Sequence, residues 1–266
     1  KIKMSLRGLD NLIKECYRDE PWIGGFFSPL SLNKTKRCWN MQNPYVRVCL
    51  FSPSVNNLTS IKKKIRDIYG VQNHSVHIND NHEETYRLGS LLFNMNSRRF
   101  LEQAQPLSKA NQEMFKKYFN ATKEQSDNYC VTGSFVLSLY GLRESRDLDF
   151  IYRKPGSELP GSHNAYESLF ETTLDDIIFN PRNHFYFAGR KVATLQVVQT
   201  MKINRNEPKD QTDVHLINKL DYKVEDDLQA RPLLRLPIKV RPNTLFDIHQ
   251  ITFHKNGLRL ENFYLN

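Results

Sequence analysis

Two aspartates that are separated by one residue, Asp147 and Asp149, follow Gly133-Ser134 in an order typical of a metal–phosphate site. Residues two apart on a strand point to the same face, so both carboxylates could share a divalent cation. Backbone N–H groups at a helix start, with a serine hydroxyl beside them, can hold phosphate oxygens. We therefore expect Asp147 and Asp149 to bind Mn²⁺ or Mg²⁺, with Asp149 also catalytic, and Gly133 and Ser134 to bind phosphate. The alternative is a surface turn that contains two aspartates.

Basic residues on both sides of this pair could neutralise the phosphates of a bound donor. Arg143 and Arg146 precede it, and Lys202 and Lys209 follow in a later helical segment. Contacts between such cations and phosphate oxygens are strong in a partly dry cleft, where Asp210 could orient the cations. The alternative for the later segment is a solvated helix face with salt bridges.

A second polar segment lies where we expect a strand to end and a helix to begin. It contains His77, Asp80, His82 and Glu83. Because α/β folds place ligands at such positions, His77, Asp80 or Glu83 could act as the general base or bind the acceptor. The alternative is a capping box, in which Asp80 caps the helix and Glu83 completes the motif, with solvated histidines.

The pattern of strands and helices that must position these residues predicts an α/β (α+β) fold with two lobes. The larger lobe is expected to have a mixed sheet with flanking helices. In the smaller, N-terminal lobe, strands at 46–51 and 75–78 around a helix at 60–69 predict a β-α-β unit. The predicted divisions are an N-terminal α/β lobe that could bind the acceptor (1–105), a helical linker (106–128), the donor and metal lobe (129–227), and a β-prone tail that packs on the core (228–266).

In the donor lobe the pattern is a strand, a Gly-Ser turn, a helix, a second strand, and then a strand pair followed by helices. The predicted ranges are 129–131, 135–140, 147–152, 184–187 and 191–195, with helices to about residue 220. The tail contains short β-prone runs at 237–240 and 258–264.

The Gly-Ser pair, a helix and then Asp-x-Asp resemble the DNA polymerase β-like nucleotidyltransferase superfamily, with Ser134 and Asp147 13 positions apart. The segment from Lys202 to Val214 looks like the Lys…Arg…Lys-Asp-x-x-Asp stretch of the nucleotidyltransferase subunits of abortive-infection toxin systems. The resemblance covers residues 129–220. It implies a nucleotidyltransferase-like sheet and transfer of a nucleotide from a nucleoside triphosphate to a hydroxyl acceptor.

The chain departs from that family in one respect, because its members usually place a third carboxylate on a neighbouring strand to complete a two-metal site. The predicted strands at 184–187 and 191–195 contain no acid, and the nearest candidates are Asp175 and Asp176. A one-metal site is therefore plausible. One cation on Asp-x-Asp neutralises the diphosphate of a nucleotide sugar in many metal-dependent glycosyltransferases.

Three segments, 77–85, 140–150 and 179–187, are together similar to uncharacterised glycan-assembly proteins of bacterial capsule loci and of large DNA viruses of algae. This resemblance implies glycosyl transfer from a UDP- or GDP-sugar to a glycan acceptor. We therefore expect a metal-dependent glycosyltransferase, with a nucleotidyltransferase that uses a nucleoside triphosphate as the alternative. A binding module that has kept the fold without the chemistry is a third possibility.

The composition limits the partners and the setting. The 266 residues have a formal net charge of +9 and a pI near 9.3, which favours an anionic partner. Nothing beyond this charge indicates nucleic acid, because no zinc-finger spacing or aromatic–basic RNA-binding motif is present. No apolar run is long enough for a membrane span, and four scattered cysteines indicate reduced thiols. We expect a cytoplasmic protein, in a host cell if the chain is viral, or an excised piece of a longer one.

Overall fold

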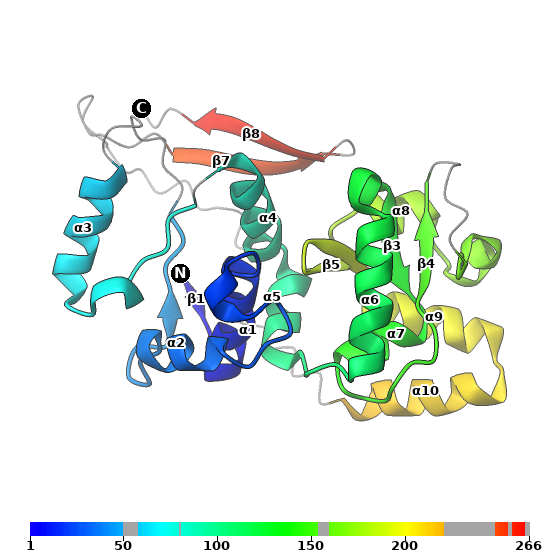
Figure 1. Ribbon diagram of the computed structural model, residues 1–266. Helices are drawn as coiled ribbons and strands as arrows, with labels where there is room; N and C mark the ends of the chain where they lie inside the picture. Colours follow the sequence, from blue (N-terminus) through cyan, green and yellow to red (C-terminus); the bar gives the residue numbers. More distant parts are fainter. Residues whose placement is uncertain (50–57, 80, 154–159, 221–247, 255–256, 264–266) are drawn as a thin grey trace.

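A four-stranded mixed sheet organises the second half of the chain in the computed structural model (Figure 1). The structure describes residues 1–49, 58–79, 81–153, 160–220, 248–254 and 257–263. The strands of this sheet are β3 (Tyr129–Thr132), β4 (Asp149–Tyr152), β5 (His184–Phe187) and β6 (Arg190–Ala193). Their order is β4-β3-β6-β5, with β3 parallel to β6 and the other two pairs antiparallel. The expected mixed α/β class, with a mixed sheet and flanking helices, is confirmed.

Helices surround this sheet and make up most of the N-terminal half. In chain order the α-helices are α1 (Leu6–Cys16), α2 (Ser31–Cys38), α3 (Leu58–Tyr69), α4 (His82–Phe93), α5 (Met95–Gln103), α6 (Lys109–Ala121), α7 (Ser134–Leu139), α8 (Leu174–Phe179), α9 (Leu195–Arg205) and α10 (Pro208–Lys219). Short 3-10 helices are η1 (Pro21–Ile23), η3 (Gln72–His74), η4 (Lys123–Asn128) and η5 (Asn164–Leu169).

The larger hydrophobic core forms around the sheet. Helix α6 lies across the sheet in Figure 1, and its Phe115 packs face to face with Phe135 of α7 at a centroid separation of 6.0 Å. Cys130 and Val131 of the central strand β3 are completely buried. Burial of large apolar side chains is the main favourable term in folding, so this core fixes the positions of the strand ends.

A second, smaller core joins α1, α4 and α5, and α5 contacts both cores. Leu101 of α5 belongs to the smaller core, together with Leu12 and Leu91. Phe100, one residue earlier, stacks on Phe185 of β5 at a centroid separation of 4.3 Å and belongs to the larger core. Because successive residues of a helix point in different directions, α5 can tie the N-terminal helices to the sheet.

The predicted β-α-β unit of the N-terminal lobe is wrong. Strand β2 (Tyr45–Val46) is short and pairs antiparallel with β1 (Ile2–Lys3), while 50–51 lie outside the described residues. Residues 75–78 are not a strand. Their backbone follows the tight turn of η3 and pairs with no strand in the part of the chain that the structure describes. A strand forms only where a partner satisfies its backbone groups. The helix predicted at 60–69 is confirmed as α3, which Gly70 ends with a φ of 66°.

The predicted capping box at the start of α4 is also wrong. The N-cap is Asn81, whose side chain accepts a hydrogen bond from the backbone N–H of Glu84 at 2.8 Å. The cap therefore lies one residue later than expected, and Glu83 has no part in it. Asp80 lies outside the described residues.

The end of the chain contains a two-stranded antiparallel sheet, β7 (Ile248–His254) and β8 (Gly257–Phe263). The β-prone run at 258–264 is confirmed over the residues of β8. The run predicted at 237–240 lies outside the described residues.

Candidate functional site

The Gly133-Ser134 turn lies directly against Asp149. Strand β3 ends at Thr132, which pairs with Asp149, the first residue of β4. Gly133 adopts a φ of 66°, and a Cβ placed on it would lie 2.2 Å from Asp149 Oδ2. A larger residue would be strained at this φ and would displace the carboxylate. The Gly133-Ser134 turn and Asp149, which are separated in the sequence, therefore contact each other in the structure.

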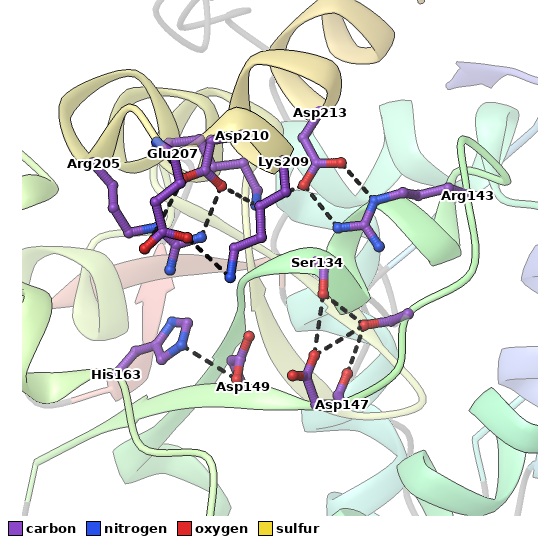
Figure 2. A network of polar contacts seen from close by, with 12 residues as sticks. Ser134, Arg143, Asp147, Asp149, His163, Arg205, Glu207, Lys209, Asp210 and Asp213 are labelled. Atoms are coloured by element: carbon purple, nitrogen blue, oxygen red, sulfur yellow. Dashed lines mark hydrogen bonds and ion pairs between the residues drawn. The ribbon is translucent and has the colours of Figure 1, made fainter.

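Asp147 reaches the same turn from outside the strand. We expected Asp147 and Asp149 on one strand, but β4 begins at Asp149, and Asp147 is an exposed residue of the preceding bend. Asp147 Oδ1 accepts a hydrogen bond from Ser134 Oγ at 3.3 Å (Figure 2). The buried hydroxyl of Ser145 donates to the Asp147 carbonyl at 2.6 Å and lies 2.6 Å from Ser134 Oγ. Hydrogen bonds, rather than strand alternation, place Asp147 at the turn that Asp149 also contacts.

His163 is a residue of this site that sequence reasoning did not identify. Its Nε2 lies 3.2 Å from Asp149 Oδ1, and its side chain is 12% exposed (Figure 2). The sequence offers no local signal for this contact, because His163 is 14 positions after Asp149 in a polar loop rich in proline and glycine.

The donor atoms at the turn suit a hard divalent cation. Among the described residues, Asp147 Oδ2 and Asp149 Oδ2 accept no hydrogen bond, and carboxylate and hydroxyl oxygens are the ligands that Mg²⁺ and Mn²⁺ prefer. Within the described ranges, no group of three or more His, Cys, Asp or Glu side chains is placed so that it could hold a metal ion without rearrangement. The residues therefore fit a cation that two carboxylates hold and that other ligands must complete.

A buried ionic network lies beside the turn, at the corner between α9 and α10 (Figure 2). Lys202 Nζ lies 3.0 Å from Asp210 Oδ1 and 2.7 Å from Asp213 Oδ2. Arg205 donates to both oxygens of Asp210, and Arg143 donates to both oxygens of Asp213. Lys202 is 2% exposed and Asp210 is completely buried. The ammonium of Lys202 is thus enclosed by carboxylates.

This network shifts the pKa values of its two carboxyl groups and of Arg143. Burial would raise the pKa of the Asp210 carboxyl, but hydrogen bonds from Arg205 and Lys202 outweigh burial and lower it to about 2. In the same way, Arg143 and Lys202 lower the pKa of Asp213 against the effect of burial. The hydrogen bond to Asp213 raises the pKa of Arg143. Asp210, Asp213 and Arg143 therefore stay charged at neutral pH.

The remaining basic candidates are more exposed. Lys209 is 66% exposed at its side chain and pairs with Glu207 at 3.0 Å. Arg146 is exposed and makes no hydrogen bond or ion pair with the described part of the chain. Both side chains are free to reorient in solvent, whereas Arg143 is fixed by its two bonds to Asp213.

The histidine-rich segment before α4 lies far from this site. Its position, next to α1, α3 and α4, is on the opposite side of the molecule from β4 and α10 (Figure 1). His77 Nε2 lies 2.7 Å from Glu84 Oε1, and its ring contacts the edge of Tyr17. Glu83 is exposed. The structure therefore does not bring His77 or Glu83 to Asp147 and Asp149.

No protein-family model, curated protein or solved structure matches the chain. Of the helices that the structure describes, none combines the length and the apolar character that a membrane crossing requires.

Proposed function

We propose that the protein is a metal-dependent glycosyltransferase, which transfers a sugar from a UDP- or GDP-sugar to a glycan acceptor. The observation that supports this most directly is the meeting of Asp147 and Asp149 at the Gly133-Ser134 turn. Two carboxylates with free oxygens suit one cation, and a single cation is sufficient to neutralise a departing nucleoside diphosphate.

Each residue at the turn would have a separate task. Asp147 and Asp149 would hold Mn²⁺ or Mg²⁺, which when bound supplies positive charge to the phosphates of the leaving group. The Ser134 hydroxyl, which now bonds to Asp147, could turn to donate to a phosphate oxygen. Because residue 133 is glycine, the backbone of the turn could also approach the phosphates closely.

The buried network would fix Arg143 beside these groups. Arg143 is held by Asp213, which is held in turn by Lys202, so the guanidinium keeps its orientation without a bound donor. A preorganised positive charge stabilises developing negative charge without reorganisation at the moment of reaction. Exposed Lys209 and Arg146 could close over the donor.

Nucleotidyl transfer from a nucleoside triphosphate is the second candidate. The arrangement of β3, the glycine turn, α7 and antiparallel β4 with Asp149 at its start favours it, because this order resembles the nucleotidyltransferase superfamily. Lys202, Asp210 and Asp213, which form the buried network, belong to the segment from Lys202 to Val214 that resembles the nucleotidyltransferase subunits of abortive-infection toxin systems. The two candidates share the donor phosphates and differ in which bond of the donor is broken.

A donor screen separates the candidates. With Mn²⁺ present, UDP- or GDP-sugars at a hundredfold excess over Kd should raise the melting temperature by roughly 5–10 °C, and nucleoside triphosphates less. Asp149→Asn should abolish the shift, while the matched control Asp67→Asn, which removes an exposed carboxylate of α3, should leave it intact. A shift with triphosphates alone would favour nucleotidyl transfer. The absence of any shift would contradict both.

A further inference from the structure

The loop that carries His163 is fastened along the edge of β4. The backbone N–H of Phe150 donates to the Gly161 carbonyl at 3.0 Å, and the N–H of His163 donates to the Phe150 carbonyl at 2.8 Å. The Asn164 side chain then bonds to both backbone groups of Tyr152, at 3.0 and 2.9 Å. Four hydrogen bonds fix the position of this histidine relative to the strand that begins at Asp149.

Gly161 is what allows this close approach. It adopts a φ of 102°, and a Cβ placed on it would lie 2.6 Å from the backbone carbonyl of Leu148. A side chain at this position would push the loop away from β4, and His163 with it. The local backbone is therefore built for the contact between His163 and Asp149.

The imidazole ring is oriented toward Asp149. His163 Nε2 lies 3.2 Å from Asp149 Oδ1, while Tyr166 packs edge to face on the ring at a centroid separation of 4.9 Å. His163 Nδ1 is buried and has no hydrogen-bond partner among the described residues. Within that part of the chain, Asp149 is thus the polar group that faces this ring.

The spacing of these two atoms matches that of neighbouring ligands of one cation. Adjacent ligands in an octahedral shell with bonds of about 2.1 Å lie roughly 3.0 Å apart. The observed 3.2 Å between nitrogen and oxygen is close to this value. A cation bound to both atoms would lie to one side of the line that joins them, so the His163 ring would turn toward it, and exposed Asp147 could turn to join them.

We infer that His163 is the third ligand of the divalent cation, beside Asp147 and Asp149. The inference rests on the proposed function, because it completes the cation site on which that function depends. It also makes the site selective. One imidazole nitrogen among oxygen ligands favours a transition metal such as Mn²⁺ over Mg²⁺, which prefers oxygen ligands alone.

The test measures Mn²⁺ binding to the full chain at one fixed pH. Titration followed by electron paramagnetic resonance gives the affinity, and pulsed measurements detect a directly bonded nitrogen. We expect the wild-type protein to show one nitrogen coupling. His163→Gln should lose that coupling and bind Mn²⁺ roughly tenfold to a hundredfold more weakly. His82→Gln, which removes an exposed histidine at the start of α4, is the matched control and should behave as the wild type.

The outcomes separate the inference from the proposed function. If the wild type binds Mn²⁺ without nitrogen coupling and Asp149→Asn abolishes binding, the carboxylate site stands and the assignment of His163 is wrong. If the wild type binds no Mn²⁺, both fail. The absence of nitrogen coupling in the wild-type protein would overturn the inference without any variant, and a coupling that persists in His163→Gln would assign the nitrogen to another residue.

Discussion

Two pairs of aspartates, Asp210 with Asp213 and Asp147 with Asp149, have opposite surroundings in this molecule. Asp210 and Asp213 are buried on α10, and every carboxylate oxygen of the pair contacts a cationic side chain. Asp147 and Asp149 lie at the end of the sheet, next to hydroxyls and a histidine, and each has an oxygen that accepts no hydrogen bond from the described residues. The same type of residue is saturated in one pair and available in the other.

This difference separates a structural role from a chemical one. Charges taken out of water must be paired, so the carboxylates of the α10 pair are committed to holding α9, α10 and Arg143 together. A carboxylate that keeps a free oxygen near solvent can still bind a cation. Substitutions of Asp210 or Asp213 should therefore lower the stability of the fold, and substitutions of Asp147 or Asp149 should weaken the binding of a cation.

Asp213→Ala should give the largest effect on stability. It would leave Arg143 without its two carboxylate bonds and Lys202 with one carboxylate instead of two. Removal of one partner of a buried ion pair costs about 3–5 kcal/mol, because the remaining charge is uncompensated. Urea unfolding measures this cost. Asp147→Ala is the matched comparison, and it should change the free energy of unfolding by less than about 1 kcal/mol.

An equal cost for the two substitutions would remove the distinction between the pairs. A small cost for Asp213→Ala would mean that water or another residue compensates Arg143 and Lys202.

Acid should remove a contribution that the buried pair makes to stability. Arg205 and Lys202 lower the pKa of Asp210 from its usual 3.8 to about 2, against burial. Since the folded pKa is below the unfolded one, this carboxylate stabilises the fold above pH 4, and the contribution disappears as the pH falls from 4 to 2. The stability difference between wild type and Asp210→Asn should shrink by about 2 kcal/mol over that range. Unfolding titrations of the two proteins at each pH measure this difference.

The sequence predicted the part of the site whose geometry is local. A β-prone strand, a glycine that needs a positive φ and a following helix are encoded within a few residues, so the approach of Gly133 to Asp149 follows from β3 pairing with β4. The contact between His163 and Asp149 is different. It depends on a loop that returns along β4 through backbone hydrogen bonds, and backbone bonds leave no pattern in side-chain types.

The N-terminal half was harder to predict for a related reason. The run at 46–51 is β-prone, but strand formation depends on a partner, and the partner of β2 is the two-residue strand β1 at the start of the chain. Helix α2 (Ser31–Cys38) was not predicted at all, because polar and basic residues make up most of it. Its position is set by tertiary contacts, such as the hydrogen bonds from Ser31 and Thr35 to Asp10.

The smallest expected effect is that of Lys209→Ala, in the segment from Lys202 to Val214. The other lysine of this segment, Lys202, serves as its comparison. Lys209 is exposed and pairs with Glu207 at 3.0 Å, and exposed ion pairs contribute little because water screens them. Lys209→Ala should therefore change the free energy of unfolding by less than about 0.5 kcal/mol. Lys202→Ala, at a buried lysine with two carboxylate partners, should cost several times more. If Lys209→Ala nevertheless weakens binding of the Mn²⁺–donor complex, measured by calorimetry, its task is to bind the donor. If neither stability nor binding changes, the solvated-face interpretation holds for Lys209.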